Sequence, residues 1–205
     1  MSIRPLSFAP PYIAVGIVIL TTMLAISGCN PAPTSCVFSY SQQHSGNVST
    51  IIWPVDSLRR DELDSYAPNF RWTKSDGTLD SLRGHAGQVV MLNFWATWCG
   101  PCTAEMPTIQ SISEQMKDSL FIIGVADDAC SPWPSVSGYI QNSNIKYQIV
   151  LDSEWALYEK YIPEAFGVGF AIPQFIFIGP DGKVRDHESG AGDKDAILSH
   201  IYKSR

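Results

Sequence analysis

The chain has 205 residues, 45% of them hydrophobic and 11% aromatic, which is enough for one packed domain with an additional segment. Its formal net charge of −6 argues against a nucleic-acid partner, because proteins that bind phosphate backbones carry basic patches. An acidic balance by itself identifies no other partner.

The first 28 residues have the pattern of an export signal. Arg4 is the only charged residue before an apolar stretch from Tyr12 to Ile26, and two small residues follow that stretch. The segment L-A-I-S-G-C, which ends at Cys29, resembles the lipobox of bacterial lipoproteins, in which the cysteine is acylated and becomes the new N-terminus. We therefore expect a lipoprotein-type signal peptide over residues 1–28 and a periplasmic-side, extracytoplasmic protein that is tethered to the membrane through a lipid on Cys29.

Two other interpretations of this segment remain open. It could be an uncleaved membrane anchor, although it is slightly short for a bilayer span of about 20 residues. It could also be an ordinary signal peptide that is cleaved without lipidation. All three interpretations place the rest of the chain outside the cytoplasm.

Residues 29–50 predict a flexible tether, and residues 51–205 predict the folded domain. The tether is rich in Pro, Ser, Gln and Asn and shows no helical period. We expect residues 50–55 to form a short edge strand, because Pro54 restricts hydrogen bonding along it. Residues 56–65 have the spacing of one or two helical turns.

A small hairpin is predicted next, formed by residues 67–72 and 78–79 around an Asp76-Gly77 turn. His85 lies in the polar turn that follows. We expect it to be a solvated loop residue and assign it no chemistry.

The most informative stretch is a buried strand over residues 88–95, followed by Cys99-Gly100-Pro101-Cys102 where a helix should begin. The helix is expected from Cys102 to about Lys117, with a kink at Pro107. Unpaired N–H groups and the positive dipole end at a helix start favour the thiolate of the first cysteine. We therefore expect Cys99 to attack a disulfide and the more buried Cys102 to resolve the product.

A metal site is the alternative for a C-x-x-C pair. A structural zinc site needs about four ligands, but the other three cysteines show no second pair and the four histidines are scattered. A c-type haem would need a histidine after the second cysteine, where Thr103 stands. We expect a redox-active disulfide, with no metal and no other cofactor. Whether Cys36 and Cys130 pair or stay free is left open by the sequence.

The remaining elements alternate between strands and helices. The strand at residues 120–126 is apolar throughout, as expected when both of its faces are covered. The others are a helix within 132–144, a strand at 147–151, helical turns at 153–161, a strand at 175–178, a turn at Asp181-Gly182 with a partner strand at 183–186, and a helix at 193–202 with Asp193 as N-cap. The order predicts an α/β domain with a mixed central sheet and helices on both faces.

The segment F-W-A-T-W-C-G-P-C (residues 94–102), with Pro107 beyond it, resembles the signature of the thioredoxin superfamily. Over the last two-thirds of the chain, A-P-N-F (67–70), L-R-G (82–84), a strand ending in Asp127 and I-P-Q-F-I-F-I-G-P-D-G-K-V (172–184) are similar to its membrane-tethered TlpA/ResA branch. The resemblance implies a thioredoxin-like fold with an added N-terminal hairpin. It also implies a thiol–disulfide oxidoreductase that acts through Cys99 and Cys102.

The same resemblance assigns residues around the cysteines. Pro173 corresponds to a cis-proline that faces the C-x-x-C motif, and the backbone of Ile172 would pair with a substrate strand; an ordinary trans proline is the alternative. Trp98 would line the recognition surface. Gly100 and Pro101 form a thioredoxin-like spacer, which favours a reducing potential.

Asn93 departs from thioredoxin, which carries a buried aspartate at this point as proton acceptor. Glu105, one helical turn after Cys102, matches the acidic residue of the TlpA/ResA branch. Burial would raise its pKa and suit it to accept the Cys102 proton. The alternative is a solvent-facing glutamate that interacts only with the helix dipole.

The resemblance implies protein disulfides as substrates, with apocytochrome c as client and a membrane thiol transporter of the DsbD/CcdA type as electron donor. Two other functions occur on the same fold. A peroxiredoxin-type thiol peroxidase would have a threonine where Ala96 stands. A copper-delivery protein would have cysteines separated by three residues and a distant histidine such as His187; the C-x-x-C spacing and Ile172-Pro173 oppose it.

Overall fold

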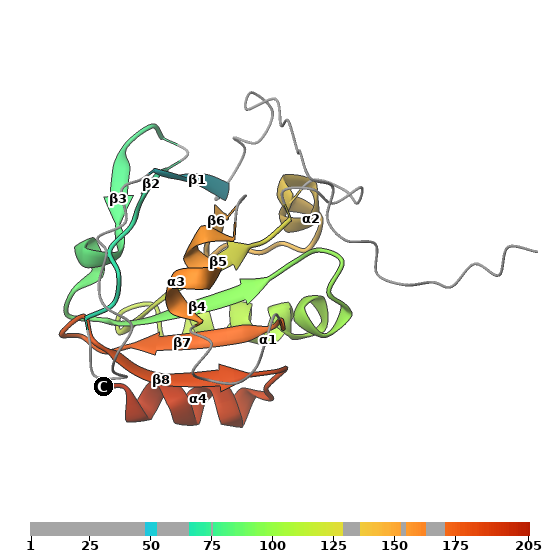
Figure 1. Ribbon diagram of the computed structural model, residues 1–205. Helices are drawn as coiled ribbons and strands as arrows, with labels where there is room; N and C mark the ends of the chain where they lie inside the picture. Colours follow the sequence, from blue (N-terminus) through green and yellow to red (C-terminus); the bar gives the residue numbers. More distant parts are fainter. Residues whose placement is uncertain (1–47, 53–65, 75, 129–135, 153–154, 163–170) are drawn as a thin grey trace, which may run out of the picture. The chain divides into compact units, whose positions relative to one another are not determined.

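The computed structural model describes residues 48–52, 66–74, 76–128, 136–152, 155–162 and 171–205 (Figure 1). Several predictions from the sequence fall outside these residues: the export signal, the tether before residue 48, the helical turns at 56–65, and Cys29, Cys36 and Cys130.

The described strands form one mixed sheet in the order β3-β2-β1-β6-β5-β4-β7-β8. β1, β6, β5 and β4 are parallel to their neighbours in this series, whereas β7 and β8 at one end and β2 and β3 at the other pair antiparallel. The strands are β1 (Val48–Ile52), β2 (Arg71–Thr73), β3 (Leu79–Ser81), β4 (Val89–Trp95), β5 (Leu120–Ala126), β6 (Gln148–Leu151), β7 (Gln174–Ile178) and β8 (Val184–Ser189). The predicted mixed sheet and the hairpin β2–β3 are confirmed.

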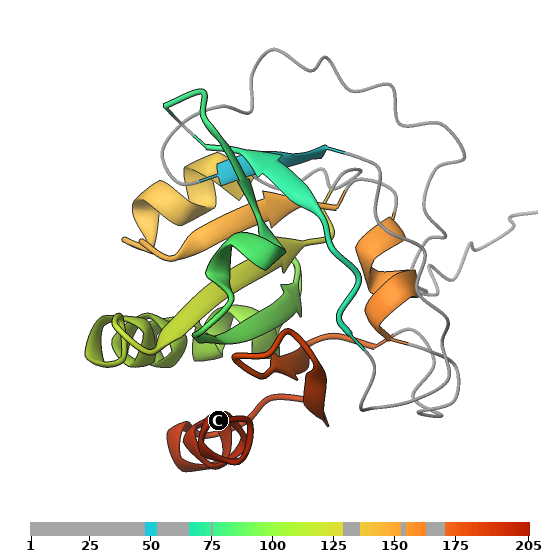
Figure 2. The ribbon, with the colours of Figure 1, turned by 90° about the vertical axis from the view of Figure 1, so that its left-hand side faces the viewer.

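Helices cover both faces of this sheet (Figures 1 and 2), as predicted. One apolar cluster joins the sheet to α1, α2 and α4, and a second cluster on the opposite face joins it to α3 and the β2–β3 hairpin. The helices are α1 (Gly100–Gln115), α2 (Val136–Asn142), α3 (Ala156–Tyr161), α4 (Lys194–Lys203) and the 3-10 helix η2 (Leu82–His85).

β4 is the central strand, and all of its side chains are buried. Successive side chains of a strand point to opposite faces, so Met91 and Trp95 belong to the first cluster, and Leu92 and Phe94 belong to the second. Because both faces are covered, the strand is apolar on both sides and contains a single polar residue, Asn93. It therefore delivers the segment after Trp95 at a fixed position on the end of the sheet.

β1 corrects one expectation. The strand lies inside the sheet, between β2 and β6, and not at an edge. A proline limits a strand only where it replaces a donor within it, and β1 ends at Ile52, before Pro54. It begins at Val48, so Val48 and Ser49, which we assigned to the tether alone, form part of the sheet.

His85 corrects another expectation from the sequence. Its side chain is only 16% exposed and its ring stacks on Phe121 of β5, with 3.4 Å between the ring centroids. Its Nε2 lies 3.3 Å from Oδ2 of Asp80. The expectation of a solvated residue was wrong because its main contact comes from a strand far along the chain.

Candidate active site

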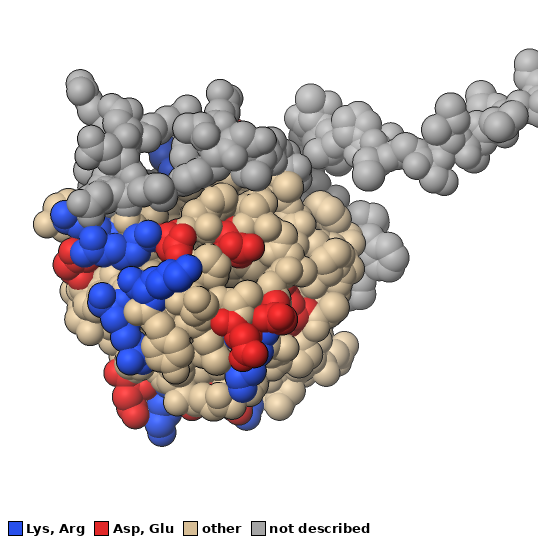
Figure 3. All heavy atoms as spheres, turned by 90° about the horizontal axis from the view of Figure 1, so that it is seen from below, with Lys and Arg blue, Asp and Glu red and all other residues tan. Residues whose placement is uncertain are grey.

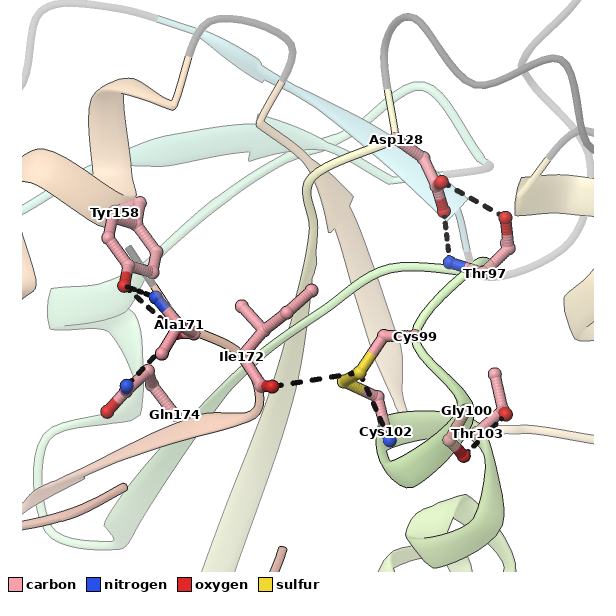
Figure 4. The surroundings of a disulfide bond; sticks show 10 residues. All are labelled: Thr97, Cys99, Gly100, Cys102, Thr103, Asp128, Tyr158, Ala171, Ile172 and Gln174. Carbon is pink, nitrogen blue, oxygen red and sulfur yellow. Dashed lines mark hydrogen bonds between the residues drawn. A yellow bond between two sulfur atoms is a disulfide. The ribbon is translucent and has the colours of Figure 1, made fainter. Parts of the chain in front are cut away.

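Cys99 and Cys102 form a disulfide where β4 gives way to α1, with 5.3 Å between their Cα atoms (Figure 4). Cys99 is the N-cap of the helix, and the backbone N–H of Cys102 donates to its Sγ over 3.3 Å. Cys99 retains 6% exposure, and Cys102 is fully buried. Cys102 is thus the more deeply buried of the two cysteines, as predicted.

The loop before Cys99 is held by a carboxylate that the sequence analysis did not single out. Asp128, just beyond β5, accepts hydrogen bonds from the Thr97 backbone N–H (2.7 Å) and from the Thr97 hydroxyl (3.0 Å) (Figure 4). Burial raises the pKa of Asp128, and the two bonds from Thr97 oppose that rise. The position of Asp128 in the sequence could have indicated this role. An acidic residue that follows one parallel strand lies at the edge of the sheet where the neighbouring parallel strand also ends.

The peptide bond between Ile172 and Pro173 is cis. It brings the carbonyl oxygen of Ile172 to 3.8 Å from Sγ of Cys99 (Figure 4). The expectation from the resemblance thus matches the geometry, and the alternative of a trans proline is wrong.

Glu105 lies on α1 and is 6% exposed, so the alternative of a solvent-facing side chain is wrong. Burial raises the pKa of its carboxyl to about 8. The backbone N–H of Gly192 and the side chain of Asn93 oppose this rise, although neither meets the carboxylate with full hydrogen-bond geometry. Asn93 itself is fully buried on β4. The site therefore holds a carboxyl group whose protonation changes at about pH 8.

The surface around the sulfurs is apolar. Trp98 is 45% exposed, and Gly100 and Pro101 are exposed beside it. Trp95, in contrast, is fully buried in the same apolar cluster as both cysteines. An exposed rim over a nearly buried disulfide suits contact with another polypeptide.

Like Asp128, the buried carboxyl group of Asp127 was not predicted from the sequence to be part of the site. It is 3% exposed, and burial together with the negative charges of Asp152 and Asp128 raises its pKa well above the usual range. It follows β5 directly, as Asp152 follows β6, and Cys99 lies four residues after the end of β4. These groups therefore gather at the carboxyl ends of the parallel strands, where α/β sheets bind their ligands.

Elsewhere, basic and acidic side chains lie intermixed on the face that Figure 3 shows. Within the described part of the chain, no group of three or more His, Cys, Asp or Glu side chains is arranged to hold a metal ion. No helix among the described residues has the length and apolarity that a bilayer crossing requires.

Comparison with known proteins shows which proteins this chain is similar to. Residues 62–201 match the Redoxin family. The thiol-disulfide oxidoreductase ResA of Bacillus thuringiensis subsp. konkukian (strain 97-27) is 30% identical over 142 residues, which cover 69% of this chain and 78% of that protein. The ResA protein of Geobacillus thermodenitrificans (strain NG80-2) is 30% identical over 140 residues, covering 68% and 76%.

Two solved structures share the fold. A putative thiol:disulfide interchange protein DsbE from Chlorobium tepidum has a TM-score of 0.57 and 25% identity, covering 69% of this chain and 96% of that one. The pneumococcal exposed lipoprotein thioredoxin Etrx1 from Streptococcus pneumoniae strain TIGR4 has a TM-score of 0.55 and 27% identity, covering 66% and 98%.

Proposed function

This chain belongs to the Redoxin family and is a thiol–disulfide oxidoreductase of the ResA/TlpA type, and we propose that it reduces protein disulfides through a relay between Cys99 and Cys102. The observation that carries the proposal is the Cys99–Cys102 disulfide at the start of α1, with the Ile172 carbonyl and the cis peptide bond beside Cys99. Such a pair can pass two electrons to a substrate disulfide as it changes from dithiol to disulfide, and a thiol reductant then returns it to the dithiol.

In the proposed reaction the reduced Cys99 thiolate attacks one sulfur of a substrate disulfide. A Cys99–substrate disulfide forms, and the other substrate sulfur leaves as a thiolate. Cys102 then attacks Sγ of Cys99, which forms the internal disulfide and releases the second substrate thiolate. Two electrons pass from the dithiol to the substrate. The N-cap position of Cys99 supports its role, because helix-start N–H groups stabilise a thiolate there.

Glu105 is proposed to take the proton from Cys102 before the second attack. A carboxyl with a pKa of about 8 can hold or release a proton under ordinary conditions. Its burial on the same helix as Cys102 supports the assignment, whereas Asn93 has no group that could accept the proton.

Substrate is proposed to bind over the exposed rim of Trp98, Gly100 and Pro101 and against the backbone of Ile172 next to Pro173. Exposed apolar surface and an accessible main chain are what an extended polypeptide recognises. We further propose that the chain acts outside the cytoplasm, tethered through a lipid on Cys29. The segment ending at Cys29 supports this, as does the similarity to an exposed lipoprotein thioredoxin.

The electron donor and the client are proposed from the family resemblance alone. A membrane thiol transporter of the DsbD/CcdA type would return the Cys99–Cys102 pair to the dithiol form. Apocytochrome c with an oxidised pair of haem-site cysteines would be reduced.

The relay is tested by Cys102→Ser, which leaves the first attack possible and removes the second. We expect mixed disulfides between Cys99 and client proteins to accumulate in cells and to be identified by mass spectrometry of the purified adducts. Cys99→Ser is the control and should trap none. Absence of adducts in Cys102→Ser, or equal trapping by both variants, would contradict the proposed roles.

The direction of electron flow is tested by the midpoint potential of the Cys99–Cys102 pair, measured in a dithiothreitol redox series. We expect a value in the range of thioredoxin, about −270 mV. A value close to that of DsbA, about −120 mV, would identify an oxidant.

A further inference from the structure

The backbone just before the cis-proline is held by two side chains, those of Tyr158 and Gln174. Ala171 is exposed, yet both of its backbone polar groups are engaged: its N–H donates to the Tyr158 hydroxyl over 3.0 Å, and its carbonyl accepts from the same hydroxyl over 2.9 Å (Figure 4). The side-chain amide of Gln174 donates to that carbonyl over 3.0 Å. From this arrangement we propose that Tyr158 and Gln174 are positioning residues that hold the Ala171–Ile172 backbone in the conformation that receives a protein substrate.

Tyr158 is itself anchored to the carboxyl end of the sheet. Asp152, which follows β6, accepts hydrogen bonds from the first N–H groups of α3, including that of Tyr158 at 3.0 Å. The Tyr158 ring packs edge-on against Phe94 of β4, with 5.7 Å between the ring centroids. Because backbone and ring are both held, the hydroxyl has a fixed place, and a phenolic hydroxyl can donate one bond and accept another.

Gln174 is held equally firmly from the other side. It is fully buried at the start of β7, and its amide nitrogen also donates to the Ser189 hydroxyl of β8 over 3.0 Å. Since the amide nitrogen of Gln174 faces a carbonyl, its amide oxygen faces His187 and accepts a hydrogen bond from Nε2, which lies 2.7 Å away. His187 therefore carries its proton on Nε2 and fixes the orientation of the amide.

The consequence is specific to protein substrates. With both polar groups of Ala171 already bonded, the next backbone available to pair with a substrate strand is that of Ile172, whose carbonyl faces Cys99. If the bonds to Ala171 were lost, its peptide could rotate. Its N–H and carbonyl would then compete with the Ile172 backbone for the main chain of the substrate. Contact with a polypeptide main chain would weaken, whereas a small disulfide that reaches only the sulfurs would be affected far less. This inference rests on the proposed thiol–disulfide exchange at Cys99.

The test uses the purified full-length chain with Tyr158→Phe, which removes only the hydroxyl. Insulin is the protein disulfide, with dithiothreitol as reductant, and 5,5′-dithiobis(2-nitrobenzoate) is the small disulfide. We expect KM for insulin to rise about three- to tenfold, the factor that corresponds to the loss of one ordinary hydrogen bond between the substrate main chain and the protein. The insulin kcat and the rate with the small disulfide should each change less than about twofold, and the midpoint potential should stay at the wild-type value.

Tyr161→Phe is the matched control, because Tyr161 lies on the same helix, is also buried, and donates its hydroxyl hydrogen bond to a different carbonyl, that of Pro68. It should lose comparable stability in thermal unfolding without a change in KM for insulin. Gln174→Met provides an independent test should Tyr158→Phe fold poorly, and it should raise the same KM.

Each other outcome counts against the proposal. An unchanged KM for insulin in both site variants, an equal rise in Tyr161→Phe, or a parallel loss with the small disulfide would overturn it. Failure of the proposed function would look different, since the wild-type chain would then not accelerate the reduction of insulin by dithiothreitol.

Discussion

At the scale of single residues, the environment of Glu105 has the clearest physical consequence. Its carboxyl is buried beside the fully buried Asn93, and burial raises its pKa from 4.5 to about 8. A group that must lose its proton inside the protein costs folding free energy whenever the pH forces it to ionise. The residue that suits the proposed proton transfer therefore also lowers stability at alkaline pH.

The direction in which pH changes stability follows from whether the folded or the unfolded chain binds the Glu105 proton. Between pH 4.5 and about 8 the folded chain keeps the Glu105 proton while the unfolded chain has lost it, so the free energy of unfolding falls as the pH rises through this window. We expect Glu105→Gln to remove this part of the decline, which amounts to roughly a few kcal/mol. Urea unfolding of both proteins at pH 5 and pH 8 measures it. Parallel pH dependences would show that Glu105 ionises normally in the folded chain.

The same variant tests the proposed role of Glu105. In the wild type, resolution of a Cys99–substrate disulfide should accelerate as the pH rises through about 8, because the carboxylate form becomes available. Glu105→Gln should lose this acceleration and resolve at least about tenfold more slowly, as followed by stopped-flow thiol release. Glu114→Gln, an exposed charge removed from the same helix, is the control and should behave as the wild type.

At the scale of secondary-structure elements, one side chain caps the N-terminus of α1 and another caps the N-terminus of α4. Cys99 caps α1 and so belongs to the helix whose N–H groups face its sulfur. Asp193 caps α4 by accepting the backbone N–H of Ala196 over 2.8 Å, as the sequence predicted. α4 packs against β8 and against α1, the helix that begins at the disulfide.

Asp193→Ala should therefore lower the free energy of unfolding by about 1 kcal/mol, the usual cost of losing a side-chain N-cap. Asp195→Ala removes an acidic residue from the same first turn without removing the cap, so its effect should be smaller. Chemical unfolding of the two variants in parallel distinguishes them. A cost for Asp195→Ala as large as that for Asp193→Ala would attribute the effect to charge and not to capping.

At the scale of the whole molecule, the functional groups come from segments that are distant in sequence. Parallel strands β4, β5 and β6 end at the same edge of the sheet, and the groups that follow them are Cys99, Asp127 with Asp128, and Asp152. β7 runs antiparallel to β4, so its beginning, with Pro173 just before it, meets the same edge. One edge of one sheet thus assembles the disulfide, the cis peptide bond and the buried carboxyl groups.

The proposed tether is also a property of the whole molecule, and it is tested by cell fractionation. With a lipid on Cys29, the wild-type chain should sediment with membranes and be released by detergent, whereas Cys29→Ser should lose the lipid. Cys36→Ser is the control and should remain with the membranes. If Cys29→Ser sedimented like the wild type, an uncleaved anchor would be indicated; a wild-type chain in the soluble fraction would indicate ordinary signal cleavage.

The sequence by itself determined the features that depend on neighbours along the chain. The buried strands β4 and β5, the C-x-x-C motif at a strand–helix junction, the β2–β3 hairpin and the Asp193 cap were all predicted. Each follows from residues that lie within a few positions of one another, through side-chain alternation, turn chemistry or capping.

Only the tertiary structure decided the rest. The place of β1 inside the sheet, the stacking of His85 on Phe121, the hold of Asp128 on Thr97 and that of Tyr158 on Ala171 all join distant segments. Such contacts depend on which strands become neighbours and which side chains lose their water, and a local pattern contains neither. A carboxyl such as that of Glu105 has an ordinary pKa until packing buries it, so its chemistry arises only once the chain has folded.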